Sequence, residues 1–427
     1  MALDVTNHAV TVVCDGEEVP GWKSYSIQTD VLQPADSFSM QVQFTRAAWS
    51  LLQPDSEITV HIDRTRILTG YIGTREKVPG TDGTMLSISG RDKTGRLVDE
   101  SAPLFSYGGK YLKELAEDIC DVGTDLALFE RVVLVNTKNR SLLRSKRARK
   151  AKISLEPLVD PVVGGFRAGA GLAGISIPEV GTDLTFKIDR PPIIEPGIFR
   201  GRAASKRVQP GQTRWAVLEE FLREARLLAW STADGRELFI GLPNYEQEAQ
   251  YMFFEASSED GRNRDVTNCS IRVVENVEEM YALYLACGAA RGNGKNYGPN
   301  VTKNIASVKD NPETNDGTGI HFARPKTLLI SDDGIKSQRD ALERAERERL
   351  QREAGRLELE ISCAGHGQIY AGDVPTIYAV DTIAEVYDED TGIADSFYVT
   401  AVDFSADDSG GTRTSIRAVP KGTLLSL

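Results

Sequence analysis

Few residues of this chain have the types and spacing that enzymes use. Residues 169–174, GAGLAG, match the GxGxxG pattern of dinucleotide sites letter for letter. Such a site needs a strand before it and a helix after it, so that the pyrophosphate meets the helix N-terminus. Here GGFRA precedes the motif and a β-rich, proline-broken stretch follows it. We therefore expect no nucleotide cofactor.

Other polar residues are equally poor candidates for catalysis. No HExxH or GxSxG motif is present, and the histidines are isolated from one another: His8, His61, His321 and His366. Adjacent carboxylates such as Asp407 and Asp408 lie in polar turns, where spacing alone does not make an acid–base pair. No set of ligands has the spacing of a metal site. The residues favour a structural or assembly protein over an enzyme, with no catalytic, metal or cofactor site.

The cysteines are scattered and odd in number. None forms a CxxC pair, and none has a histidine at ligand spacing. Free cysteine packs as a small hydrophobic residue. We expect buried, reduced thiols at Cys14, Cys120, Cys269, Cys287 and Cys363.

The chain of 427 residues carries a formal net charge of −12. A protein that reads DNA sequence usually has a basic face, so sequence-specific nucleic-acid binding is not expected. An acidic wall can still surround DNA, because like charge lets a polyanion slide without adhering. No apolar run reaches the roughly 18 residues of a membrane helix, and the N-terminus resembles no secretory signal. We expect folding in a cytoplasm.

Hydrophobic periodicity predicts a mainly β protein with an α+β insert, divided into three domains. Residues 1–102 alternate as short antiparallel strands separated by turns, typical of a barrel or sandwich. Residues 103–245 are expected to form an α+β domain, with Thr213 capping its second helix. Residues 246–427 return to β, except for a long helix at 338–355 that Ser337 and Asp340 begin as a capping box.

A basic, glycine-rich insertion interrupts the α+β domain at about residues 136–207. Two interpretations are open: a solvated loop, as blocks of like charge often are, or a clamp on an acidic partner. The candidate contact residues are Lys138, Arg140, Arg144, Lys146, Arg147, Arg149, Lys150 and Lys152.

The order of several motifs resembles a known family. PADSFSMQV (34–42), ILTGYIG (67–73) and SGRDKTGRLVDESA (89–102) are followed by GQTRWAVLEEFLREARLLAWSTADGRELFIGLP (211–243) and YVTAVDFSADDSGGTRTSIRAV (398–419). Together they resemble the baseplate hub proteins of contractile-tailed phages, most closely the Mu type. The insertion has no counterpart in this resemblance.

The resemblance implies a homotrimeric ring in which each chain supplies two tail-tube-like β domains. Such a ring adapts the sixfold tail tube to the threefold central spike and lines the channel for DNA and the tape-measure protein. Its partners would be the spike, the tube, the tape-measure and the wedge proteins of the baseplate. It would be a virion protein assembled in the host bacterial cytoplasm. The alternatives are a type VI-like spike component, a hub with peptidoglycan-hydrolase activity and a carbohydrate-binding module.

Overall fold

The computed structural model describes residues 8–80, 83–103, 111–135, 208–225, 227–255, 269–289, 302–310, 325–332, 335, 337–369, 376–407, 411–421 and 423–426. The expected insertion at about 136–207, with its candidate contact residues, lies outside them. The chain divides into two compact units. Of the described residues, unit 1 contains those of 8–135, 208–276 and 354–426, and unit 2 contains those of 277–353.

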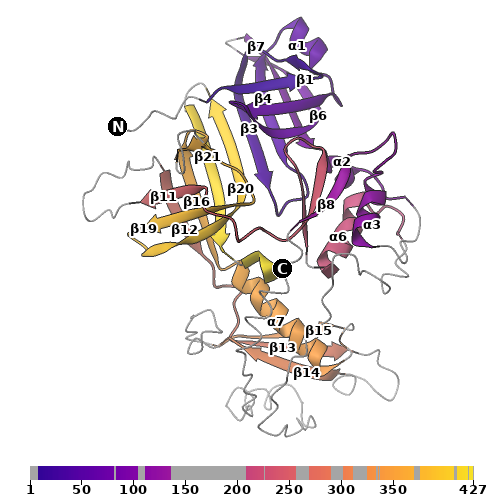
Figure 1. The fold of residues 1–427 in the computed structure, drawn as a ribbon, viewed down its shortest axis with the longest axis vertical. Coiled ribbons are helices and arrows are strands. Elements are labelled where there is room, and N and C mark those ends of the chain that lie inside the picture. Colours follow the sequence, from indigo (N-terminus) through magenta and orange to yellow (C-terminus); the bar gives the residue numbers. More distant parts are fainter. Residues whose placement is uncertain are drawn as a thin grey trace. The chain divides into compact units, whose positions relative to one another are not determined.

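The first part of unit 1 is antiparallel β, as the alternation predicts (Figure 1). Its elements are β1 (Val10–Cys14), β2 (Glu17–Glu18), β3 (Trp22–Asp30), β4 (Ser37–Gln43), α1 (Arg46–Leu51), β5 (Glu57–Ile62), β6 (Thr65–Gly80) and β7 (Gly83–Asp92). Successive side chains of a strand point to opposite faces. In β4, Phe38, Met40 and Val42 are buried, whereas Ser39 and Gln41 are exposed. We call this part the first β half.

A second β half follows in the last part of unit 1. Its elements are β11 (Tyr251–Glu255), β12 (Cys269–Glu275), β16 (Leu357–Ala364), β17 (Gly367–Gln368), β18 (Thr376–Ile377), β19 (Thr382–Asp388), β20 (Ile393–Asp407), β21 (Gly411–Pro420) and η2 (Thr423–Ser426). Among the described residues, thirteen strands of the two halves form one sheet. Its main path runs β12-β16-β21-β20-β3-β4-β7-β6-β5-β1-β2, and β19 joins β11 to β20.

A small α+β region lies between the two halves in sequence. Its elements are α2 (Thr94–Asp99), α3 (Leu112–Ile119), β8 (Arg131–Val135), α6 (Arg214–Ala225), β9 (Leu228–Ser231) and β10 (Glu237–Gly241). The strands form a sheet in the order β8-β10-β9. Helix α6 begins as predicted, because the Thr213 hydroxyl accepts the N–H of Ala216 at 3.2 Å. Leu115, Leu218 and Leu238 meet in the core of this region.

Unit 2 contains a mixed sheet and one long helix. Its elements are β13 (Leu283–Ala289), β14 (Thr302–Lys309), β15 (Thr327–Asp332) and α7 (Gln338–Ala354). Ala341 and Ala345 of α7 pack with Tyr284 and Ala286 of β13. The predicted capping box is present, with Asp340 N–H donating to the Ser337 hydroxyl at 3.1 Å.

The sequence placed these elements of unit 2 inside residues 246–427. The structure assigns Val277–Glu353 to a unit distinct from the strands on either side. It also places β14 inside residues 288–320, where the glycine- and asparagine-rich composition predicts only a loop. Ala306 and Val308 of β14 pack against the core of unit 2, and this tertiary contact outweighs the weak local signal. The three domain boundaries expected from the sequence stay a prediction.

The expectation of five reduced cysteines is wrong for one pair. Cys269 of β12 and Cys363 of β16 form a disulfide, with their Cα atoms 4.2 Å apart. They are direct partners in the antiparallel register, although 94 residues separate them in sequence. Spacing along the chain could not reveal that proximity. Cys14, Cys120 and Cys287 are free and buried, as predicted.

Candidate functional site: the seam between the two β halves

The two β halves meet in an antiparallel pairing of β3 with β20, which we call the seam (Figure 1). Its register runs from Asp30 opposite Ala401 to Tyr25 opposite Ala406. On the inner face, Ile27 and Phe404 are buried in a core cluster that includes residues of both halves. The halves therefore share backbone hydrogen bonds and one hydrophobic core, and separating them would expose apolar surface of both.

One end of the seam carries an ion pair between the halves. Arg417 Nη2 of β21 lies 2.7 Å from Asp30 Oδ2 of β3. The other oxygen of Asp30 accepts the N–H of Leu32 at 2.8 Å. Asp403 of β20 also lines this spot, and burial raises the pKa of its carboxyl, with Arg417 opposing the shift. The buried Asp30 carboxylate thus depends on the second half for its counter-charge.

The other end of the seam carries a buried network around His366. His366 Nδ1 lies 2.9 Å from the Thr414 hydroxyl, which donates to the carbonyl of Gly365 at 2.6 Å. Since the Thr414 proton is used there, its oxygen accepts from Nδ1–H. His366 Nε2 is then an acceptor for the Tyr25 hydroxyl, 2.5 Å away. The network fixes one neutral tautomer, and burial lowers the pKa of His366 to about 4.

A second histidine lies against this network. The rings of His8 and His366 are stacked with centroids 5.8 Å apart, and His8 Nδ1 is 2.6 Å from Asp63 Oδ2. The isolated histidines of the sequence are thus partly brought together: His8 and His366 meet, whereas His61 is near Arg66. Among the described residues no group of three or more His, Cys, Asp or Glu side chains is placed to hold a metal ion.

The motif SGRD joins the first half to the α+β region. Asp92 Oδ1 accepts from the Thr94 hydroxyl at 2.5 Å and from the N–H of Gly95, so it caps the turn into α2. Its Oδ2 accepts from the hydroxyl of Ser231 in β9 at 2.5 Å, a link the sequence did not suggest. Burial raises the pKa of Asp92 to about 6, and these hydrogen bonds oppose the shift. A Cβ at Gly90 would lie 2.0 Å from the Tyr71 carbonyl oxygen, so this position needs glycine.

The outer side of the sheet at the seam is rich in serine. Its residues are exposed or half-buried and alternate with core residues along each strand. We call this surface the serine face; it consists of Ser26, Ser37, Ser39, Ser89, Ser270, Ser362, Ser405 and Ser415, with Gln28 and Asp403 at the seam itself.

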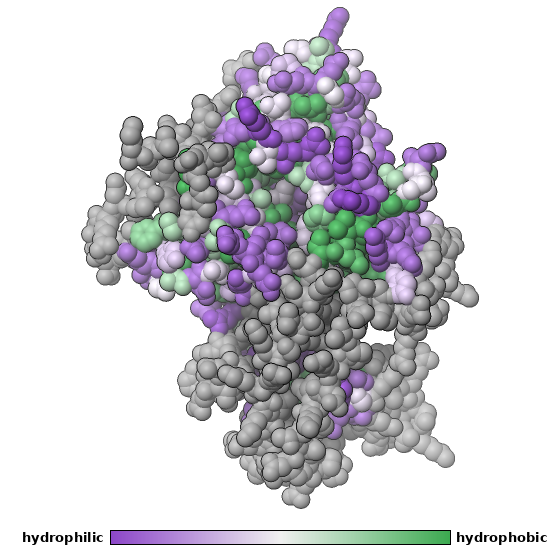
Figure 2. Space-filling view, viewed as in Figure 1, coloured by the Kyte–Doolittle hydropathy of each residue, from purple (hydrophilic) through white to green (hydrophobic). Residues whose placement is uncertain are grey.

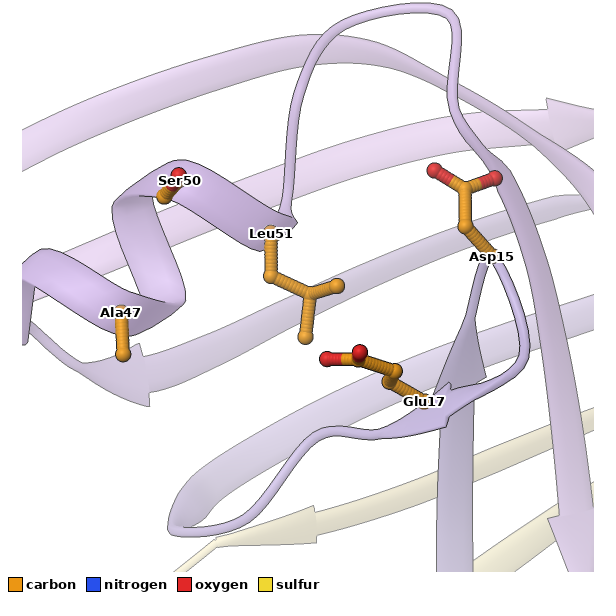
Figure 3. Close-up of a pocket in the computed structure, with 5 residues that line it drawn as sticks. All are labelled: Asp15, Glu17, Ala47, Ser50 and Leu51. Carbon is orange, nitrogen blue, oxygen red and sulfur yellow. The ribbon is translucent and has the colours of Figure 1, made fainter.

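A cleft of about 290 Å³ lies elsewhere in the first half, between α1 and the β1–β2 turn (Figure 3). Asp15, Glu17, Ala47, Ser50 and Leu51 line it. Asp15 accepts the N–H of Glu57 at 3.3 Å and therefore holds the neighbouring strand. The cleft lining has no histidine, cysteine or lysine beside its carboxylates. We assign it no catalytic role.

The described surface in the view of Figure 2 shows hydrophilic residues interspersed with smaller hydrophobic areas. Trp49 is 37% exposed and stacks under the Arg75 guanidinium, 3.7 Å from the ring centroid. No helix in the described part of the chain is long and apolar enough to cross a membrane.

The candidate contact residues between Lys138 and Lys152, and the GAGLAG motif, lie outside the described residues. The residues of the seam were not singled out from the sequence. Asp30 and Arg417 are 387 residues apart, and no local signal pairs them. The one available signal was the faint repeat of strand, polar turn and strand at 67–90 and 397–419, which marks β6–β7 and β20–β21.

Comparison with known proteins agrees with the resemblance found in the sequence. Residues 9–92 match the family model described as Mu phage baseplate assembly protein GpP-like, N-terminal. The baseplate hub protein gp44 of Escherichia phage Mu is 30% identical over 118 residues, which are 27% of this chain and 31% of gp44. The match thus spans less than a third of that relative.

Two solved structures share the fold over 98% of each chain. They are the tail protein from Neisseria meningitidis MC58, with 19% identity and a TM-score of 0.63, and the 43 kDa tail protein of prophage MuSo2 from Shewanella oneidensis, with 16% identity and a TM-score of 0.64. Residues 9–92 thus match the Mu phage baseplate assembly protein GpP-like N-terminal domain, and the resemblance of the chain to Mu-type baseplate hub proteins is confirmed.

Proposed function

We propose that this chain is a structural hub of a phage tail baseplate and a component of the virion. The observation that carries the proposal is the seam, which joins two β halves of one chain into a continuous sheet and a shared core. Residues 9–92 match a baseplate family model, and the fold recurs in two tail proteins, one of them from a prophage. A structural role rather than an enzymatic one is consistent with the names of these relatives.

The two β halves act as tube-like domains in a homotrimer. Three copies then supply six such domains, which adapt the sixfold tail tube to the threefold spike. The ring lines the channel for DNA and the tape-measure protein. A rigid seam suits this role, because force transmitted between tube and spike must not separate the halves. Obligate assemblies of this kind bury about 2,000–5,000 Å² per interface, which gives the ring its stability.

The basic residues between Lys138 and Lys152 provide a contact with an acidic baseplate partner. Replacing Lys146, Arg147 and Lys150 by Glu reverses the charge of this segment. We expect the variant to keep its unfolding midpoint and to lose co-purification with the wedge or spike proteins. If the variant still co-purifies with these proteins, the contact is refuted and the solvated-loop interpretation holds.

The hub function is tested by the native mass of the purified chain, with negative-stain images of the same sample. Threefold rings with an open centre are the expected result, either alone or after addition of the spike and tube proteins. Particles purified from the producing bacterium should contain the chain at the junction of tube and spike. Absence of rings in the presence of both partners would refute the hub function.

A further inference from the structure

The serine face forms rows that cross the seam without interruption. Directly opposed residues of antiparallel strands share a face. One row runs from β12 to β7 through Ser270, Ser362, Ser415, Asp403, Gln28, Ser37 and Arg91. The next runs from β16 to β6 through Ala364, Arg413, Ser405, Ser26, Ser39, Ser89 and Thr74. At about 4.8 Å between strands, each row is roughly 29 Å wide.

Strand propensity does not account for this composition. Solvent-facing strand positions favour threonine, β-branched and aromatic residues. Serine is instead short and uncharged, and its hydroxyl can both donate and accept. The Ser37 hydroxyl of β4 donates a hydrogen bond to the Gln28 amide oxygen of β3 at 3.1 Å. At the seam itself the two rows carry Ser26, Ser405, Gln28 and Asp403, with no lysine or arginine among them.

Three arginines on this surface have acidic partners close by. Arg272 pairs with Glu360 at 2.6 Å, Arg417 with Asp30 at 2.7 Å, and Arg91 with Asp99. None of the large hydrophobic residues exposed in the described part of the chain belongs to the rows. No lysine belongs to them either. Affinity for nucleic acid comes mainly from clustered Lys and Arg that neutralise phosphates and release counterions. This surface lacks such a cluster.

We propose that the serine face is the part of the chain that duplex DNA slides along. The inference rests on the proposed hub function and names the surface that faces the channel. With three arginines paired, the positive charge on this face is not clustered to hold the phosphates, while the hydroxyls keep a hydrated layer between wall and polyanion. The net charge of −12 adds a mild repulsion. The face allows passage because it offers DNA no adhesive contact.

The test adds positive charge to the face in assembled particles. The variant S39K/S405K places two lysines beside the seam, and the control S50K/Q53K places two on exposed positions at α1. DNA release from purified particles is timed at about 50 and 200 mM salt. We expect S39K/S405K to slow release about tenfold or more at the lower salt and to recover at the higher, because each added phosphate contact is salt-dependent. The control should match the wild type at both.

Wild-type release by S39K/S405K at both salts, in particles that contain the variant, would overturn the proposal. Should that variant not enter particles, S39C is labelled after assembly with a trimethylammonium thiol reagent and compared with S50C. A label that leaves release unchanged also overturns it. Failure of the hub function is distinguished by a prior measurement: the wild-type chain would then be absent from purified particles.

Discussion

Tyr25 of the first β half and His366 of the second meet in a buried hydrogen bond of 2.5 Å, with the tyrosine hydroxyl donating to Nε2. The two residues are 341 positions apart. The bond exists only while the seam is closed, and it requires a neutral imidazole. His366 therefore couples the joint between the halves to protonation.

The first prediction concerns the loss of folding stability at acid pH. Burial lowers the pKa of His366 to about 4, whereas an unfolded histidine titrates near 6.5. The contribution of neutral His366 to the unfolding free energy is therefore fully present above pH 6.5. It is lost as the pH falls towards 4, by about 3 kcal/mol in total. We expect H366Q to remove this pH-dependent contribution. The measurement is the free energy of unfolding in urea at pH values between 7 and 4.

H61Q provides the control, because His61 is a half-buried histidine in β5 of the first half, near Arg66 and away from the seam network. The difference between H366Q and the wild type should shrink with falling pH, and H61Q should change the slope far less. An equal pH slope in H366Q and the wild type would contradict the neutral-imidazole network.

The second prediction concerns Asp92, whose shift has the opposite sign. Its pKa of about 6 lies above the usual 3.8, so its stabilising term is fully present below pH 3.8 and is lost as the pH rises through 6. At pH 7 the protein bears the cost of a buried carboxylate. A neutral amide of the same shape avoids that cost and keeps acceptor capacity, so D92N should unfold within about 1 kcal/mol of the wild type.

D92A should lose about 2–3 kcal/mol at pH 7, because the Ser231 and Thr94 hydroxyls and the Gly95 N–H lose their acceptor. D99A, which removes an exposed partner of Arg91, is the control and should cost less than about 1 kcal/mol. Urea unfolding measures all three variants. Equal losses in D92N and D92A would contradict this account, because they would show that the joint needs the carboxylate itself.

The third prediction compares two ion pairs of the same sheet. R417M leaves the buried Asp30 without its counter-charge and should cost about 2 kcal/mol, which is below the full buried-pair range because Arg417 is half-exposed. A double-mutant cycle with D30N measures their coupling. The exposed Arg272–Glu360 pair, taken through R272M and E360Q, should give less than about 1 kcal/mol. Equal coupling energies in both cycles would contradict the prediction that the seam pair stabilises the fold more than an exposed pair does.

The fourth prediction concerns the Cys269–Cys363 bond. The denatured, unreduced chain should titrate as three free thiols, Cys14, Cys120 and Cys287, and the reduced chain as five. C269S/C363S should lose about 2–4 kcal/mol of stability under oxidising conditions, because the bond closes a long loop in the unfolded chain. C287S serves as the control and leaves the bond intact. Five free thiols before reduction would disprove the bond.

The sequence by itself determined the local elements of this protein. Alternation of Phe38, Met40 and Val42 with polar residues predicts β4, and Thr213 and the Ser337–Asp340 pair predict where α6 and α7 begin. These signals are local because side-chain period and capping involve residues within one or two turns. The motif SGRDKTGRLVDESA indicated the resemblance to Mu-type hub proteins in the same way, since it is a contiguous strand, turn and helix.

Only the tertiary structure decided what joins the parts. The seam pairs β3 with β20, the serine rows cross it, and the contacts of Asp30 with Arg417, Tyr25 with His366 and Cys269 with Cys363 depend on that pairing or on its neighbours. Strand register between distant segments is set by which apolar faces can be buried together, not by any residue near them in sequence. The ion pair, the hydrogen bond and the disulfide therefore follow from the packing of both halves around a single core and not from the local sequence.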